Sequence, residues 1–473
     1  MKNNLEYRGE WFLPSKPEKG ILAILYFDNE QGGRLELIGS FSDDIFIPTI
    51  GKYEIILGIT SESKEITLYN SFAPKSTGLT LSREKEIGKP LTTIIVNFIF
   101  EGIHTYSLED LRFEKLISEI NNLDEWINIS GFQRRDLDLE KRKRHEIEIQ
   151  YKAPEQIKFN INDTLKGTFN FVANNLRFGS FEKEITITQK VELIIESNVP
   201  FTIEDGLRTL ISFQNFIILG LYQHAFPSFI KLHSKKFETK FPDGYKSPID
   251  IKLYFTISDN RKRKKNKDLY DMLFSYGHIK NEFQSTIKNW FKKYETLEPA
   301  FDLVFEQFYS NERFSTNTFL NLAKAAETFH ARLYNHTKFP KTEFKKMKEV
   351  ILQLTPTEYH KRLNDQFNFG NNLNLYSRLI ELCDKYSNSV LDKVIGEKEI
   401  FVKQVKNSRN YYTHYSDISK AKALEGQELY ILTEKLKILL VSAFLLEVGF
   451  ERTLLENLLE NNKHRFFNHL IKW

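Results

Sequence analysis

Two side chains near the C-terminus offer a fixed positive charge and a group that can move protons. Arg409 and His414 lie five residues apart in the segment 401–415. A guanidinium does not lose its proton, so on a buried face it needs a partner or a ligand. An imidazole is the side chain best suited to proton transfer near neutral pH. The pair could therefore hold an anionic group and transfer a proton.

The spacing of this pair limits how it could act. An apolar stripe of the predicted helix is formed by residues three and four apart, namely Val402, Val405, Arg409 and Tyr412. Five residues separate two side chains by about 140° around a straight helix. Arg409 and His414 can converge only if the helix ends or bends, or if a second copy brings its own pair. Spacing alone leaves open an arginine that caps a bundle core and an exposed histidine without a catalytic role.

Several other catalytic motifs are missing. The segment 88–90 is Gly-Lys-Pro and lacks the upstream glycine and the hydroxyl residue of a P-loop, and neither H-E-x-x-H nor G-x-S-x-G occurs. His330 and His336 are six residues apart, which does not suit a helical metal pair, so we expect ordinary surface or partly buried histidines. Cys383 is the single cysteine and fits a small core residue. We expect no metal and no cofactor.

One basic run could contact phosphates. Residues 261–267 hold six charges in seven positions, and Arg261, Lys262 and Arg263 are candidates for RNA binding. A solvated hairpin tip or linker is the alternative interpretation. Over the whole chain, 67 basic and 63 acidic residues leave a net charge of +4, which does not by itself indicate a nucleic-acid-binding protein.

The elements that must position these side chains change character along the chain. Alternation of apolar and polar residues predicts strands in the first half. They cover 21–27, 35–38, 53–59, 92–100, 146–151, 157–161, 185–187, 191–195 and 251–257. Apolar residues at helical spacing over 203–232 predict one helix that packs across a sheet.

Beyond about residue 268 the period becomes helical. Steps of three and four predict amphipathic helices over 269–294, 320–333 and 429–446. The predicted fold class is α+β, with antiparallel sheets followed by an all-α helix bundle. We expect a β-rich region over 1–267, a helical connector over 268–311 and a helical domain over 312–473.

The length and composition fit a protein of the cytoplasm. A chain of 473 residues with one cysteine suggests two large domains or about three ordinary ones in a reducing compartment. The most apolar stretches, 211–222 and 438–446, are too short or too polar to span a membrane. No leader sequence is evident at the N-terminus. We therefore expect a soluble cytoplasmic protein without membrane contact.

The motif around Arg409 resembles that of a known family. The segment 409–414, Arg-Asn-Tyr-Tyr-Thr-His, is similar to the R-N-x-x-x-H motif of HEPN ribonucleases, and 321–330 resembles their first helix, which carries an acidic residue. The N-terminal half resembles the ApeA N-terminal domain, and 289–291 resembles its junction with HEPN. The residues that carry the N-terminal resemblance are Gly9-Glu10-Trp11, Pro14, Gly39, Gly58, Thr67-Leu68, 113–123, Trp126 and Gly131.

This resemblance implies an anti-phage protein in which the N-terminal region senses or restrains and a HEPN domain cuts RNA. It implies a homodimer through the HEPN domain, no metal, a phage-encoded trigger, and an RNA substrate for which transfer RNA is one candidate. Arg409 would hold the phosphate and His414 would transfer protons. Asn410 would orient His414 or donate a hydrogen bond, and Glu327 would pair with Arg409 and support the site.

Two other functions stay open at this point. A catalytically silent HEPN-fold module could act as a scaffold, although a scaffold does not need both Arg409 and His414. A HEPN partner that modifies nucleotides would need a G-S pair closely followed by D-x-D. The pairs at 39–40 and 179–180 are followed by no such motif.

Overall fold

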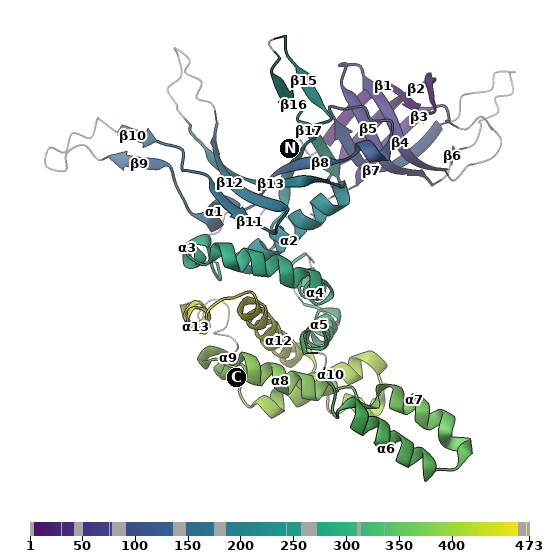
Figure 1. The fold of residues 1–473 in the computed structure, drawn as a ribbon, viewed down its shortest axis with the longest axis vertical. Coiled ribbons are helices and arrows are strands. Elements are labelled where there is room, and N and C mark those ends of the chain that lie inside the picture. Colours follow the sequence, from purple (N-terminus) through teal and green to yellow (C-terminus); the bar gives the residue numbers. More distant parts are fainter. Residues whose placement is uncertain are drawn as a thin grey trace. The chain divides into compact units, whose positions relative to one another are not determined.

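The computed structural model describes residues 4–29, 31–41, 51–74, 76–77, 91–135, 148–174, 186–242, 244–256, 272–309, 314–334, 336–461 and 470. The chain forms two compact units, a β-rich unit and a helical unit (Figure 1). The first contains Met1–Leu221, Ala225–Leu269 and Ser275–His278, and the second contains Tyr222–His224, Tyr270–Phe274 and Ile279–Trp473. The predicted fold class, a β-rich region followed by a helical one, is confirmed.

A closed antiparallel barrel forms the N-terminal part of the β-rich unit. Its strands are β1 (Asn4–Leu13), β2 (Lys16–Asp28), β3 (Gly32–Ile38), β4 (Gly51–Thr60), β5 (Glu65–Ala73) and β7 (Leu91–Glu101). They pair in the order β7-β3-β2-β1-β4-β5, and β5 returns to β7. The short strand β6 (Ser76–Thr77) also pairs with β7. Inward-facing apolar residues of alternating strand positions fill the barrel, as the period-two pattern predicts.

A close approach of two strands allows one large side chain into this core. Trp11 is fully buried and lies opposite Gly58 in the pairing of β1 with β4. A Cβ atom at Gly58 would meet the Trp11 ring at 2.3 Å, so no larger residue fits there without movement.

Strand β7 also belongs to an open sheet. Residues 95–101 of β7 pair with β5 along one edge, whereas the other edge pairs with β3 at 91–96 and with β17 (Ile251–Phe255) at 98–101. The sheet continues from β17 through β14 (Pro227–His233), β8 (Phe113–Ile120), β13 (Gln189–Phe201) and β12 (Leu165–Ala173) to β11 (Ile157–Asn160). One strand therefore joins the barrel to the sheet.

Shorter elements complete the β-rich unit. They are η1 (Leu108–Asp110), α1 (Leu123–Ile127), the pair β9 (Phe132–Arg135) and β10 (Glu148–Tyr151), and the pair β15 (Glu238–Lys240) and β16 (Lys246–Pro248). Helix α2 (Ile203–Leu221) packs on β8 and β13. Trp126 of α1 is fully buried and contacts the rings of Phe169, Phe216 and Tyr276.

The structure corrects three sequence predictions at this level. Residues 186–187 of the predicted strand 185–187 belong to no strand. The predicted helix 203–232 ends at Leu221, and the following apolar residues form β14, because a short buried apolar run suits a strand as well as a helix. The predicted helix 269–294 is interrupted, since α3 (Tyr276–Ile279) and α4 (Phe283–Tyr309) are separate, and residues 269–271 lie outside the described part.

Ten helices besides a short 3-10 turn are described after residue 280. They are α4, α5 (Thr316–Tyr334), α6 (Lys341–Gln353), α7 (His360–Gly370), α8 (Leu375–Tyr386), α9 (Ser389–Ile395), α10 (Lys398–His414), α11 (Asp417–Lys420), α12 (Gly426–Glu447) and α13 (Arg452–Asn461), with η3 (Thr357–Tyr359). Asn374 and Asn388 cap α8 and α9 by accepting backbone N–H groups. None of the described helices is both long and apolar enough to cross a membrane.

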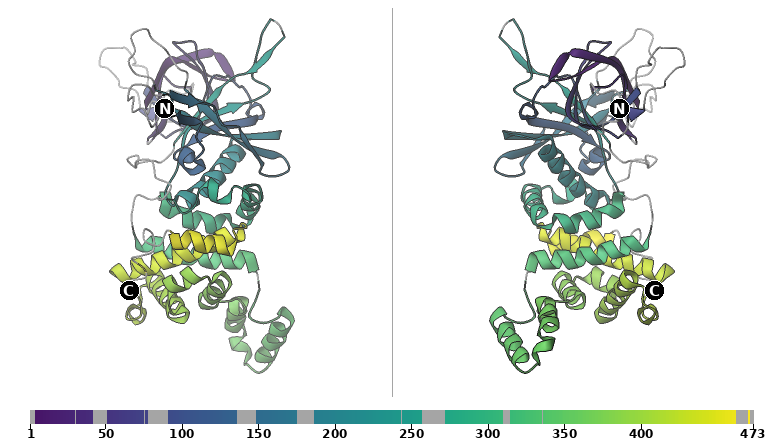
Figure 2. Two further views of the ribbon diagram at one scale, coloured as in Figure 1. Left: turned by 90° about the vertical axis from the view of Figure 1, so that its left-hand side faces the viewer. Right: turned by 90° about the vertical axis from the view of Figure 1, so that its right-hand side faces the viewer.

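Helix α5 is the centre of the helical unit, because α4, α8, α10 and α12 all pack against it. Helix α4 begins inside the segment predicted as a connector, yet it belongs to this compact unit. The predicted boundaries at 267 and 311 lie outside the described residues and stay predictions. Figures 1 and 2 show α6 and α7 as a hairpin that stands away from the other helices of the unit.

A buried polar network fixes α8 to α5. His330 on α5 is 0% exposed, and Arg378 on α8 places Nη1 3.0 Å from its Nδ1. A guanidinium has only donors, so Nδ1 must be the acceptor and the proton lies on Nε2. That nitrogen donates to Glu381 Oε2 at 2.7 Å. Burial lowers the pKa of His330, which favours the same neutral imidazole. The prediction of a surface or partly buried histidine is wrong for His330.

The network predicts unequal effects for the two neighbouring histidines. We expect His330→Ala to lower the free energy of unfolding by about 2–4 kcal/mol, because it leaves a cavity and removes the partner of Arg378. His336 is 46% exposed and contacts the same Glu381 carboxylate at 2.9 Å. His336→Ala should change the stability by less than about 0.5 kcal/mol. Urea unfolding followed by circular dichroism measures both, and equal effects would contradict the assigned network.

Candidate active site

Helix α10 ends at the predicted catalytic histidine. His414 is its last residue, and Tyr415 follows in the left-handed conformation with φ 49° and donates its N–H to the Tyr411 carbonyl at 2.5 Å. A helix end at His414 is one of the conditions under which the Arg409 and His414 side chains could converge. His414 is exposed, and within the described part of the chain its imidazole forms no hydrogen bond or ion pair. The ring is therefore free to exchange protons with a ligand.

Two side chains anchor this helix end to the segment before α12. The N–H of Leu424 donates to Ser408 Oγ at 3.0 Å, and the Tyr412 hydroxyl donates to the Leu424 carbonyl at 3.0 Å. Ser408 is fully buried, and the Tyr412 ring contacts Phe319 of α5. Both backbone polar groups of one loop residue are thus satisfied by α10, which fixes the position of the last helical turn.

Arg409 lies beside the acidic residue expected from the sequence. Its Nη2 is 3.6 Å from Glu327 Oε2, and the two side chains are 36% and 37% exposed. The expected pairing is present, while the roles of both residues in catalysis stay predictions. Val402 and Val405 are buried, but Arg409 is not, so its placement on a buried face is corrected. A half-exposed pair at this distance is weak and leaves guanidinium donors for an anionic ligand.

Asn410 faces Arg409 in this structure. Its Oδ1 accepts a hydrogen bond from Arg409 Nη1 at 3.4 Å. The structure therefore brings Arg409, Asn410 and Glu327 together, but among the described residues it shows no hydrogen bond from any of them to the His414 imidazole. Within one chain Arg409 therefore has side-chain partners, whereas His414 has none among the described residues.

Sequence reasoning missed two cations on the same helix. Lys403 and Lys406 are exposed. Together with Asn410 and His414 they form a series with steps of three, four and four residues. That spacing places them on one face of α10, and it was visible in the sequence. They could contact the phosphates of a strand that reaches His414.

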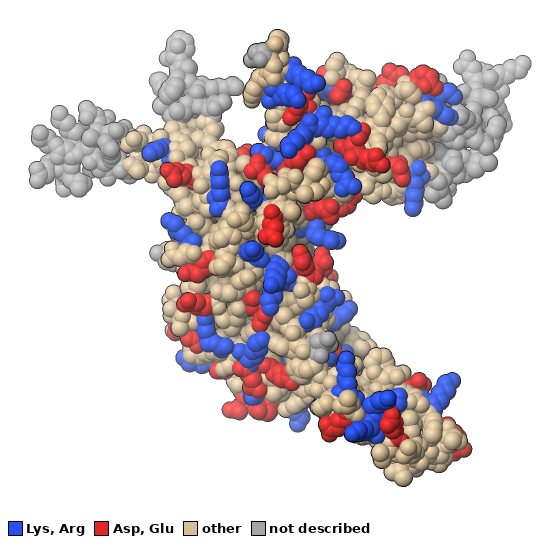
Figure 3. All heavy atoms as spheres, in the orientation of Figure 1, with Lys and Arg blue, Asp and Glu red and all other residues tan. Residues whose placement is uncertain are grey.

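The basic candidates for RNA binding, Arg261, Lys262 and Arg263, lie outside the described residues. Over the face shown in Figure 3, basic and acidic side chains are interspersed on both units. This surface agrees with the small net charge of the chain.

One group has the residue types of a metal site. The ligand atoms of His330, His336 and Glu381 lie within 4.8 Å of one another. A metal on His330 Nε2 would require the proton on Nδ1, which would then face the donors of Arg378. The residues fit a hydrogen-bond network and do not fit a metal.

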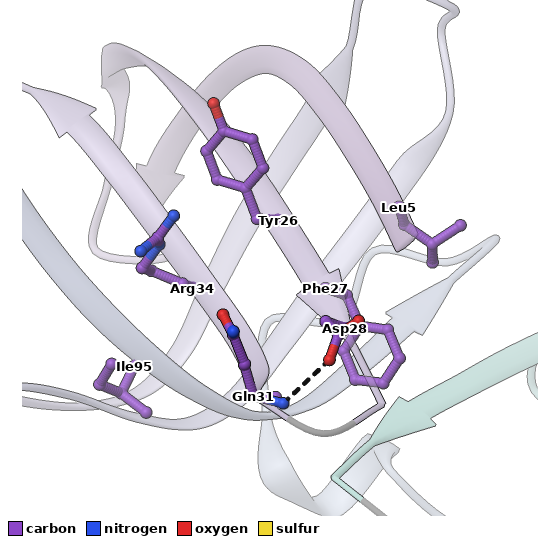
Figure 4. Close-up of a pocket in the computed structure, with 8 residues that line it drawn as sticks. Leu5, Tyr26, Phe27, Asp28, Gln31, Arg34 and Ile95 are labelled. Atoms are coloured by element: carbon purple, nitrogen blue, oxygen red, sulfur yellow. Dashed lines mark hydrogen bonds between the residues drawn. The ribbon is translucent and has the colours of Figure 1, made fainter. Parts of the chain in front are cut away.

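A recess in the barrel is formed by residues far in sequence from Glu327, Arg409 and His414. It is lined by Leu5, Tyr26, Phe27, Asp28, Gln31, Gly32, Arg34 and Ile95 (Figure 4). Arg34 lies over the Tyr26 ring, 5.3 Å from its centre, and also pairs with Glu36. The Gln31 N–H donates to Asp28 Oδ1. These contacts hold the turn between β2 and β3 and bring together no catalytic set.

Two family models match the chain. The model described as ApeA N-terminal domain 1 matches residues 6–290, and the model described as Apea-like HEPN matches residues 320–454. The second range contains Glu327, Arg409, Asn410 and His414. No curated protein and no solved structure matches significantly. The resemblance found in the sequence is confirmed, and more than half of the chain is covered by the first model. The chain therefore belongs to the ApeA family, with an ApeA N-terminal domain followed by an Apea-like HEPN domain.

Proposed function

We propose that this protein is an anti-phage endoribonuclease that cleaves RNA through its HEPN domain and so halts the infected cell. Membership in the family supports a defence-type function. The observation that carries the proposal is the end of α10. There an unengaged His414 follows Arg409, whose guanidinium is held only loosely by Glu327. A scaffold would not need this pair of groups at an exposed helix end.

The proposed chemistry uses the nucleophile that RNA itself carries. The 2′-OH attacks the adjacent phosphate, its proton goes to a base, and the 5′-oxygen leaves after receiving a proton. His414 supplies the proton transfer, and Arg409 stabilises the charge that develops on the phosphate oxygens. The products are a 2′,3′-cyclic phosphate and a 5′-OH. No step requires a metal or a cofactor.

A second copy of the chain would complete the site. Arg409 contacts Asn410 and Glu327, and no contact among the described residues joins this group to His414, so a second copy is proposed to bring its own Arg409 beside this histidine. HEPN domains often dimerise and bind RNA, which supports a homodimer through this domain. Across such an interface Arg409 of one chain would lie beside His414 of the other, so that each complete site needs one residue from each chain.

The N-terminal domain is proposed to control this activity and to answer a phage-encoded trigger. Its described residues hold polar groups mainly in structural pairs, such as Glu101 with Tyr7, Tyr254 and Lys252. That carboxylate links β1, β7 and β17 and is nearly buried. The substrate is proposed to be RNA, with transfer RNA as one candidate.

Alanine at either end of the motif should abolish cleavage. We expect His414→Ala to reduce the rate by about 10²–10⁴-fold, because it removes proton transfer. Arg409→Ala should be similarly inactive because it removes the phosphate contact. The cleavage rate of Glu327→Gln should lie between that of the wild type and those of the two alanine variants. His336→Ala and Arg362→Ala, exposed residues of the same unit, are the matched controls. The assay is cleavage of total RNA by purified variants with equal circular dichroism, and wild-type rates for His414→Ala would favour the scaffold function.

Mixing two inactive variants tests the shared site. If Arg409 of one chain works with His414 of the other, dimers that combine Arg409→Ala and His414→Ala chains contain one complete site. We expect the mixture, refolded or co-expressed, to cut RNA although neither variant does alone. Sedimentation must show a dimer. A fully active monomer, or an inactive mixed dimer, would contradict the shared site.

Removal of the N-terminal domain should release the nuclease. A fragment of residues 272–473 retains α4 and the whole of α5 to α13, whereas a start near residue 295 would divide α4. We expect this fragment to cut RNA without a trigger and to be toxic when expressed, and the same fragment with His414→Ala to be harmless. A folded, dimeric fragment that cuts only after the N-terminal domain is added back would contradict the regulatory role.

A further inference from the structure

Aromatic rings surround the end of α10, and one of them is largely exposed. Tyr415 is 64% exposed and directly follows His414. Its ring contacts Tyr411 at 5.4 Å and Tyr412 at 6.1 Å between centroids, both at steep angles. Tyr411 and Tyr412 are themselves 4.9 Å apart. Large exposed aromatics on a surface that also holds charged groups often mark a binding site.

The backbone of Tyr415 is unfavourable for its side chain. It occupies the position after the helix with φ 49°, where glycine or asparagine is preferred. A bulky residue in the left-handed region is uncommon and strained. The turn therefore does not explain why a tyrosine stands there, since a smaller residue would make the same turn with less strain.

The inner rings hold the outer ring in place. Tyr412 is fixed by its hydroxyl on the Leu424 carbonyl and by contact with Phe319, which is fully buried. The Tyr411 ring packs against Tyr412, and the Tyr415 ring packs against both. The rings contact one another in series from the core to the surface. The Tyr415 side chain is therefore already held in position, and it loses little conformational entropy when a flat ligand stacks on it.

We propose that Tyr415, supported by Tyr411, stacks an unpaired base of the RNA substrate beside His414. The inference rests on the proposed function for its substrate. Base stacking on an aromatic ring needs a base that is not enclosed in a duplex, so the site selects single-stranded segments or loops. Lys403 and Lys406, exposed on the same helix, would contact the backbone of that strand.

The test separates the ring from the turn. Tyr415→Gly and Tyr415→Asn remove the ring and keep a residue that accepts the left-handed conformation, whereas Tyr415→Phe restores the ring. The probe is a fluorescent single-stranded RNA oligonucleotide, measured by anisotropy in the full chain carrying His414→Ala so that it is not cut. We expect the Gly and Asn variants to bind about 5- to 150-fold more weakly and Phe to restore binding. Tyr359→Ala, which removes another exposed tyrosine of this unit, is the control and should bind normally.

The outcomes distinguish this inference from the proposed function. If the Gly and Asn variants bind the oligonucleotide like the parent, or if duplex RNA suffers the same loss, the stacking site is wrong. Loss of cleavage in His414→Ala would then still support the nuclease. If neither the wild-type chain nor the released fragment of residues 272–473 cuts RNA but binding depends on the Tyr415 ring, the nuclease is wrong and the stacking site stands. If neither of them binds RNA, both proposals are overturned.

Discussion

The burial of helix α5 is the constraint on which the helical unit depends. Four helices pack around it, and its apolar residues Phe319, Leu322, Ala326 and Phe329 are fully buried. On its buried faces such a helix can carry polar groups only where a partner meets them. Glu327 meets Arg409 of α10, and His330 meets Arg378 and Glu381 of α8. The same helix thus orients Arg409 of the candidate site and, about one turn later, fixes α8.

The two pairings of α5 differ in their exposure to water, and this difference suits different tasks. His330 is enclosed and its tautomer is set by Arg378, so it is a structural residue. Arg409 and Glu327 are each about one-third exposed. A polymer such as RNA cannot enter a closed cavity, and an exposed helix end with a loosely held guanidinium is accessible to it. In the proposed mechanism, Glu327 keeps the guanidinium in place until a phosphate of the substrate replaces it.

The sequence predicted what depends on local period and missed what depends on tertiary neighbours. Alternation and helical spacing gave the β-rich and helical regions, and the motif placed Arg409 and His414 on one helix with Glu327 nearby. The burial of His330 could not be foreseen, because its partner Glu381 lies 51 residues away. The run 203–232 was read as one helix because a short apolar strand has no period that separates it from a buried helix. Helical spacing alone would have predicted that Lys403 and Lys406 share one face of the helix.

The pairing of β7 with both the barrel and the open sheet affects how the β-rich unit unfolds. It pairs with β5 nearby in sequence and with β17, from which Lys252 reaches Glu101 across 151 residues. A shift of β7 by one residue would turn its core side chains outward in the barrel and the open sheet at once. Contacts so distant in sequence form slowly, because a long loop must close before they are made. Because barrel and sheet share β7, we expect the two to unfold together, in one cooperative transition.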